Sequence, residues 1–180
     1  MKIPLLISLL FIWTHCDAQK KSRTKFVLRV MDLSSAKNFV LQKLFSETGD
    51  TVSFQSLLVT NIGMEKIKAY DSSDLAQSVS GKDALDYLSN NSIANLYLLD
   101  RWCFYQGGKT MKINISGFGI GGFTGNKMLW FSYKDLSEVL AKYSLINSDK
   151  TKMSCLAFFS DRYFQSELVK IVEDWKDDDN

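Results

Sequence analysis

The stretch LYLLDRWCFYQGGKTMKINISGFGIGGFTGNKMLWFSYKDLSEVLAKY, residues Leu96–Tyr143, decides the fold. It contains two apolar arms, 94–105 and 110–116, around the sequence Gln106-Gly107-Gly108-Lys109. Glycine accepts the positive φ of a tight turn, so this segment predicts a β-hairpin. Apolar and polar residues alternate in the second arm, which indicates an antiparallel strand with one solvated face. A third strand is expected over 127–133.

Aromatic residues are concentrated on these strands. They are Trp102, Phe104, Tyr105, Trp130, Phe131 and Tyr133. Because neighbouring side chains of a strand point to opposite faces, both faces of the predicted sheet carry aromatic groups. Helices of the same chain could cover the second face, or another chain could cover it. The six residues are therefore our candidate interface, since aromatic residues are enriched at interface centres.

Helical periodicity flanks the strands. Apolar residues recur at helical spacing over 32–45, 53–62, 80–88, 132–143 and 160–175. Short extended segments are expected over 66–70 and 153–159. These elements predict a single α+β domain, in which a small antiparallel sheet of about 3–4 strands packs with several amphipathic helices.

The N-terminus has the features of a targeting segment. Lys2 is followed by the apolar run Ile3–Trp13, which is too short to span a bilayer. Cys16 and Ala18 are small residues at the positions that a signal peptidase requires, so we expect a signal peptide over 1–18, cleaved between Ala18 and Gln19. Lipidation of Cys16 is the alternative, although the bulky residues before it do not favour that reading.

The remaining chain divides into a basic N-terminal arm over 19–30, a domain over 31–176 and an acidic tail over 177–180. Solvated, frayed ends are one interpretation of the two charged segments. Attraction between neighbouring copies of the protein is the other, because the arm and the tail carry opposite charge.

Composition excludes several kinds of chemistry. The only histidine, His15, lies in the predicted signal peptide, so the mature chain has no histidine for a catalytic triad or a metal site. A formal net charge of +2 gives no indication of nucleic-acid binding. We therefore expect no catalytic residues, no cofactor and no metal ligands.

Other motifs have simple structural interpretations. The glycine-rich run 117–125 leads from one strand into another and lacks the P-loop lysine, so we expect a flexible connection. Four acids, Asp71, Asp74, Asp83 and Asp86, fit a solvated surface. The step Asp100-Arg101 is expected to be an exposed pair, or a register mark on a partner-facing strand.

Two cysteines, Cys103 and Cys155, remain after signal cleavage. In an oxidising compartment they could form a disulfide that closes a long loop. They could equally be buried thiols that pack as small hydrophobic groups.

Several segments together resemble the GldN/PorN family. They are Asp-Arg-Trp-Cys-Phe (100–104), Ile-Ser-Gly-Phe-Gly-Ile (115–120), the run from Leu129 to Tyr143, Phe-Phe-Ser-Asp-Arg-Tyr-Phe-Gln-Ser (158–166), and upstream the segment from Ser56 to Asp71. The resemblance implies a non-enzymatic, periplasmic structural subunit of the gliding-motility and type IX secretion machinery.

The same resemblance implies the partners. Such a subunit joins an outer-membrane lipoprotein of the GldK/PorK type in a ring at the inner side of the outer membrane, as a homo- and hetero-oligomer that reaches the membrane only through its partner. Two other function classes stay open: a small exported binding or immunity-type module that uses the aromatic sheet face, and an enzyme that binds a nucleotide at the glycine-rich run.

Overall fold

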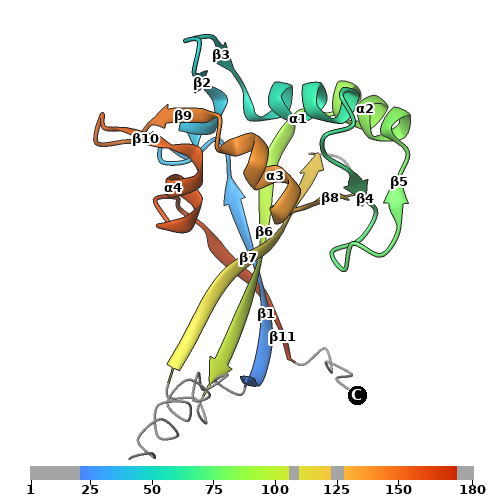
Figure 1. Cartoon of the computed structure of the whole chain (residues 1–180), viewed down its shortest axis with the longest axis vertical. Coiled ribbons are helices and arrows are strands. Elements are labelled where there is room, and N and C mark those ends of the chain that lie inside the picture. The colour runs from blue at the N-terminus through green and yellow to red at the C-terminus, as the bar shows by residue number, and fades with distance from the viewer. Residues whose placement is uncertain (1–20, 106–109, 123–127, 174–180) are drawn as a thin grey trace, which may run out of the picture.

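The computed structural model describes residues 21–105, 110–122 and 128–173 of the chain, which are mostly β (Figure 1). A seven-stranded sheet has the order β11-β1-β6-β7-β8-β4-β5, and a four-stranded sheet has the order β10-β9-β2-β3. The predicted α+β domain with one small sheet is therefore wrong. The physical reason is that both ends of the domain, predicted as a free arm and a helix, pair with each other as strands.

The large sheet is antiparallel throughout. Its long strands are β1 (Lys21–Asp32), β6 (Ile93–Tyr105) and β7 (Thr110–Gly122), with β11 (Glu167–Glu173) at one edge. Shorter strands complete the other side, namely β8 (Met128–Ser132), β4 (Ala69–Tyr70) and β5 (Ser78–Val79). The expected strands over 94–105 and 127–133 are thus confirmed, and Lys21–Asp32 is an inner strand rather than a frayed arm.

The small sheet and the helices lie together. The sheet consists of β10 (Lys152–Ser154), β9 (Tyr143–Ile146), β2 (Leu44–Ser46) and β3 (Thr51–Val52). The helices are α1 (Phe54–Gly63), α2 (Gly81–Asn90), α3 (Tyr133–Leu140) and α4 (Cys155–Ser160), with a 3-10 turn η1 (Phe39–Gln42). The predicted helices over 53–62 and 80–88 are confirmed. The helix predicted over 132–143 is confirmed only as far as Leu140, because Tyr143 begins β9.

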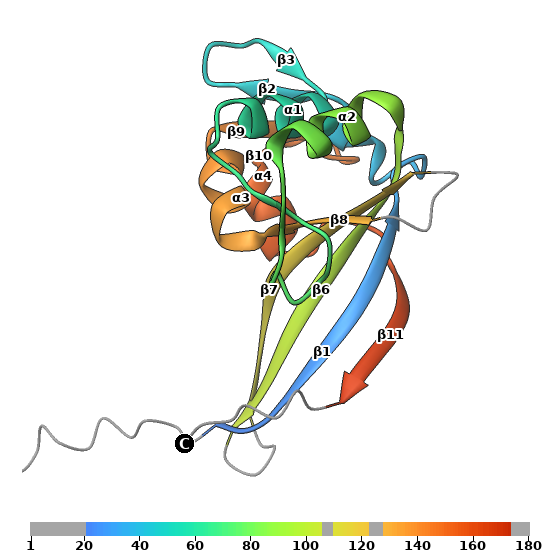
Figure 2. The same ribbon diagram turned by 90° about the vertical axis from the view of Figure 1, so that its right-hand side faces the viewer.

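Two regions of the large sheet differ in what covers them (Figure 1). In the region that we call the head, α1–α4 and the small sheet lie over one face of the strands. The tail consists of 24–29, 100–105, 110–115 and 168–173, which extend beyond the helices (Figure 2). The same long strands therefore run from a region covered by helices into one that none of the described helices covers.

Serine hydroxyls begin three of the helices. The Ser53 Oγ accepts a hydrogen bond from the Ser56 amide at 3.0 Å, and the Ser154 Oγ accepts one from the Ala157 amide at 3.0 Å. At α2, the Ser80 Oγ accepts from the Asp83 amide at 3.1 Å and donates to the Asp83 Oδ2 at 2.7 Å. These bonds satisfy amides that have no partner within the first turn of a helix.

The predicted helix over 32–45 is wrong, because tertiary hydrogen bonds hold this segment in another shape. The buried Asn38 side chain donates to the Asp32 carbonyl at 2.9 Å and to the Gln165 carbonyl at 2.8 Å, and it accepts from the Gln165 amide at 3.0 Å. Apolar periodicity cannot reveal a polar side chain that bridges two distant segments. Only the turn η1 is helical here.

The C-terminal elements also differ from the predictions. The strand expected over 153–159 is only Lys152–Ser154, and α4 follows it. The chain then turns at Arg162, whose φ of 61° ends the helix, and Glu167–Glu173 pairs with β1. The sequence of β11 has no alternation of apolar and polar residues and fits a helical pattern, but pairing with β1 makes it a strand. The helix predicted from Ser160 is therefore wrong.

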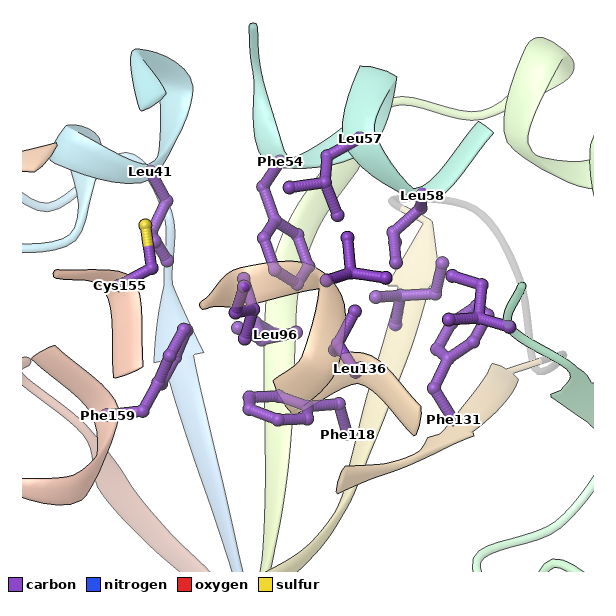
Figure 3. Packing of buried hydrophobic residues seen from close by; sticks show 14 of the residues in the cluster. Leu41, Phe54, Leu57, Leu58, Leu96, Phe118, Phe131, Leu136, Cys155 and Phe159 are labelled. Carbon is purple, nitrogen blue, oxygen red and sulfur yellow. The ribbon is translucent and has the colours of Figure 1, made fainter. Parts of the chain in front are cut away.

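The core lies between the head sheet and its helices (Figure 3). One row of cross-strand partners, Met31, Leu96, Ile120 and Leu129, has no exposed surface. Directly paired residues of antiparallel strands share a face, so this row identifies the core face of the sheet. The Phe118 and Phe159 rings meet edge to face at 4.9 Å, and Phe54 lies 6.5 Å from each of them. Such aromatic contacts add to the stabilisation from burial.

Candidate interaction surface

The structure divides the six predicted interface residues between the two regions. Phe131 and Trp130 are 1% and 6% exposed, and Tyr133 is half-buried with its ring 5.7 Å from that of Phe118. Burial raises the pKa of the Tyr133 hydroxyl above its usual value of 10.0. These three residues contribute to the packing of the head, so they do not form the accessible surface that the sequence predicted.

The glycine-rich run is part of a strand rather than a flexible connection. Gly117–Gly122 continues β7, with Phe118 and Ile120 on the core face and alternate glycines on the other face, which we call the outer face. A Cβ atom at Gly119 would lie 3.0 Å from three atoms of the Trp130 ring. Glycine therefore lets Trp130 lie directly against the backbone of β7. The part of the run over 123–127 lies outside the described residues.

Aromatic rings thus cover the outer face of the head. The cross-strand row on that face is Tyr97, Gly119, Trp130 and Tyr70. The Tyr97 ring lies 3.4 Å from a Cβ atom built at Gly121, so a second aromatic ring lies close to a glycine of the same strand. Side chains of the sheet itself therefore cover part of this face.

The tail has a different surface. Trp102, Phe104 and Tyr105 lie on β6, between β1 and β7, and are half-buried. Five large apolar side chains on the flanking strands are 41–53% exposed, and these are Met111, Ile113, Leu168, Val169 and Ile171. They lie on β7 and β11, the two strands that bound the tail. Grouped exposed apolar side chains are typical of an interaction surface.

Strand register places most of this surface on one face. Trp102 is opposite Ile113, and Phe104 is opposite Met111. On the other side of the tail, Ile171 is opposite Val27, and that row continues to Asp100. These residues lie on the continuation of the core face; Val27 and Asp100 are buried there, whereas Met111, Ile113 and Ile171 are exposed. The tail strands extend beyond helices α1–α4 (Figure 2). We call this continuation of the core face the apolar tail face.

A buried ion cluster marks the boundary between head and tail. Asp100 is 1% exposed; its Oδ2 accepts a hydrogen bond from Arg29 Nε at 3.1 Å, and its Oδ1 lies 2.9 Å from Arg162 Nη1. The Arg162 guanidinium also lies 5.6 Å from the centre of the Phe164 ring. Asp100 is therefore not the exposed residue that the sequence predicted. A carboxylate in this environment needs charged partners because burial removes it from water.

The ion cluster joins segments that are distant in the sequence. Arg29 belongs to β1, Asp100 to β6, and Arg162 to the turn that leads from α4 into β11. The ion cluster lines a surface pocket of about 240 Å³ together with Ile113, Phe164 and Ser166. The cluster can therefore fix the direction in which β11 leaves the head.

The cysteines are both free and lie in different regions. Cys103 is buried on β6 in the tail, whereas Cys155 is buried at the start of α4 in the core (Figure 3). Burial raises the pKa of the Cys155 thiol to about 12, which keeps it protonated at neutral pH. The possible disulfide is thus absent from the structure, and Cys155 packs as a small hydrophobic residue.

The acidic residues behave as solvated groups. Asp71, Asp74, Asp83 and Asp86 are exposed, as predicted. The Ser72 hydroxyl and the Ala76 amide donate to Asp74, and these bonds lower the pKa of its carboxyl. Within the described ranges, no group of three or more His, Cys, Asp or Glu side chains could hold a metal ion. No helix among the same residues is long and apolar enough to cross a membrane.

Sequence reasoning missed the edges of the tail. Alternation did identify Met111, Ile113 and Ile115 as one side of a strand, but it could not tell that the helices end before they reach the first two. In β11 the usable signal is the stretch Leu168–Val172, which lies between two glutamates and is apolar except for Lys170, and this stretch also fits a helix. The predicted cleavage site at Ala18 and Gln19 and the acidic segment 177–180 lie outside the described residues.

Comparison with known proteins adds a family to this geometry. A family model described as "Gliding motility associated protein GldN" matches residues 19–179. No curated protein matches the chain. The matched residues include the head, the tail and the ion cluster between them.

Proposed function

This chain belongs to the GldN family of gliding-motility-associated proteins, and from that premise we propose that it is a non-catalytic structural subunit of the gliding-motility and type IX secretion machinery. We place it in the periplasm, at the inner side of the outer membrane. Its partners in this proposal are further copies of itself and an outer-membrane lipoprotein of the GldK/PorK type, which together form a ring-like complex.

The observation that carries the proposal is the family match over 19–179, which spans both regions of the fold. The distribution of apolar surface supports the structural role. The head buries its aromatic residues internally, while the tail exposes five large apolar side chains on its bounding strands. A subunit of an assembly needs such a surface on a folded support.

The architecture suits a subunit whose contact surface is held rigidly. The tail strands are continuous with β1, β6 and β7 of the head, and the Asp100 ion cluster links the turn before β11 to β6 and β1. Sites on strands of a scaffold are held more precisely than sites on loops. The tail can therefore present its surface in one fixed direction relative to the core.

Gene deletion with complementation tests this function. The deletion strain is expected to lose gliding and type IX secretion, and the full chain supplied in trans is expected to restore both. The protein should also co-fractionate with outer-membrane complexes and be retained with the lipoprotein during purification. Unchanged gliding and secretion, together with a freely soluble monomer in the periplasmic fraction, would contradict the proposal.

A further inference from the structure

The tail has two open strand edges. β8 pairs with β7 only over Gly117–Gly121, so the segment Thr110–Ser116 has β6 on one side and, within the described residues, no strand on the other. β11 is the terminal strand of the sheet and pairs with β1 alone in the same part of the chain. We call Thr110–Ser116 the β7 edge and Glu167–Glu173 the β11 edge. An open edge presents backbone donors and acceptors that can pair with another strand.

Both edges also carry exposed apolar side chains. Met111 and Ile113 on the β7 edge are 49% and 41% exposed, and Leu168 and Ile171 on the β11 edge are 53% and 46% exposed. Their register with β6 and β1 places all four on the same side of the sheet as the core face, with Leu168 in the row of Arg29 and Leu98 at the boundary with the head. A strand added at either edge would therefore extend one continuous apolar surface.

The strand directions of the tail make its two edges compatible. β11, β1, β6 and β7 alternate in direction, so the first and last of these strands run in opposite directions. If a second copy is placed beside the first in the same orientation, its β11 edge meets the β7 edge of the first copy in an antiparallel arrangement. The core faces of the two sheets then lie on the same side. No strand needs to be reversed or turned over.

Charge distinguishes this contact from the symmetric ones. The β7 edge contains Lys112 and no acidic residue, whereas the β11 edge contains Glu167, Glu173 and Lys170. Pairing one β7 edge with another would bring lysines to a single seam, and pairing two β11 edges would bring glutamates together. Contact between unlike edges instead brings a basic segment beside one whose net charge is negative.

We propose that the β7 edge of one copy pairs with the β11 edge of a second copy, so that the tails form a continuous antiparallel sheet. This contact uses a different patch on each partner, which generates rings or open arrays rather than closed dimers. It deepens the assembly proposed above by naming a contact within it, and in that sense it rests on the proposed function. Its test, however, uses the purified chain alone.

Two single-cysteine additions test the pairing. Asn114→Cys is on the β7 edge and Lys170→Cys is on the β11 edge, and both positions are exposed on the outer face. Each mature variant carries a different tag, and the two are mixed and oxidised. A crosslinked product containing both tags is expected, with only trace product from either variant alone. The wild-type chain is the background control, because Cys103 and Cys155 are buried.

Other outcomes would overturn the proposal. A product that forms equally well from Asn114→Cys alone would indicate symmetric pairing of β7 edges. Absence of any mixed product, with circular dichroism showing both variants folded, would exclude this contact and leave the edges to a different protein.

A charge substitution gives an independent readout. Ile113→Lys places a charge on the apolar side of the β7 edge and should weaken self-association by about tenfold or more in sedimentation experiments. Ile146→Lys is the matched control, because Ile146 is 45% exposed but lies on β9 in the small sheet. Equal self-association of both variants would contradict the proposal.

The two hypotheses can fail separately. If gene deletion abolishes secretion but the purified chain never forms the mixed crosslink, the strand contact is wrong and the structural role stands. If the crosslink forms but deletion leaves gliding and secretion intact, the structural role is wrong and the contact stands.

Discussion

The head and the tail use the same long strands but bury them in different ways. In the head, helices cover the core face, and aromatic rings lie against β7 glycines on the outer face. In the tail, none of the described helices covers the strands (Figures 1 and 2), and the bounding strands expose apolar side chains. The difference teaches that the aromatic content of a sheet does not identify an interface. The place along the strands where the helices cease to cover them is more informative about a candidate interface.

The largest expected effect comes from the centre of the head. Phe118→Ala removes a ring that contacts both Phe54 and Phe159, and it should lower the free energy of unfolding by about 3–5 kcal/mol. Chemical denaturation of the mature chain measures this change. A loss below about 1 kcal/mol would mean that the head is less tightly packed than the structure indicates.

The boundary between the regions should respond next. Asp100→Asn removes the charge between Arg29 and Arg162 and should cost about 2 kcal/mol, less than a fully buried ion pair because both arginines retain solvent contact. Hydrogen exchange should increase mainly in β11. Asp86→Asn, at an exposed position of α2, is the control and should change neither quantity. Unchanged hydrogen exchange in β11 would mean that the ion cluster does not hold the tail strands in place.

The packing of Trp130 against Gly119 of β7 can be tested by adding a single methyl group to the glycine. Gly119→Ala places a Cβ atom 3.0 Å from the Trp130 ring and should cost about 1–2 kcal/mol in the free energy of unfolding. Gly63→Ala is the matched control, because a Cβ atom there meets nothing within 4 Å. Equal stability of the two variants would contradict the close approach of Trp130 to β7.

The pH dependence of stability should report the buried thiol of the head. The pKa of Cys155 is raised from 9.0 to about 12, so the folded state holds its proton more tightly than the unfolded state does. This contribution is fully present below pH 9 and declines as the pH rises toward 12. The loss between pH 9 and 10 should be about 1 kcal/mol. Cys155→Ala should remove it, and an unchanged pH profile in that variant would contradict the assignment.

The smallest effect on stability is expected at the tail edge. Ile113→Lys changes a side chain that is already 41% exposed, so its free energy of unfolding should stay within about 0.5 kcal/mol of the wild-type value. Denaturation at low protein concentration measures this without a contribution from self-association. A large loss would indicate that Ile113 packs within its own chain.

Sequence patterns predicted the elements whose local signals agree with their tertiary environment. Apolar residues at helical spacing predict the helices over 53–62 and 80–88, and the structure adds a capping serine before each of them. The glycine turn beside an apolar arm predicts the β6 strand. The errors arose where distant contacts decide the conformation. Asn38 bridges to Gln165, and β11 pairs with β1, across more than half of the chain.

The candidate surface was predicted only in part for a related reason. Trp102, Phe104 and Tyr105 do lie in the tail, but the buried Trp130 is indistinguishable from them in sequence. Its burial depends on the alternate glycines of β7, which were interpreted as a flexible connection. Recognising Phe118 and Ile120 between those glycines as a period of two would have indicated a strand with one face free of side chains.

Complementation with the tail-edge variant tests the central claim most directly, since that claim assigns stability to the head and assembly to the tail. The account predicts that Ile113→Lys yields a folded, exported chain that fails to restore gliding and type IX secretion to the deletion strain. The matched variant Ile146→Lys is expected to restore both. Full restoration by Ile113→Lys, at the same protein level as the wild type, would contradict the account.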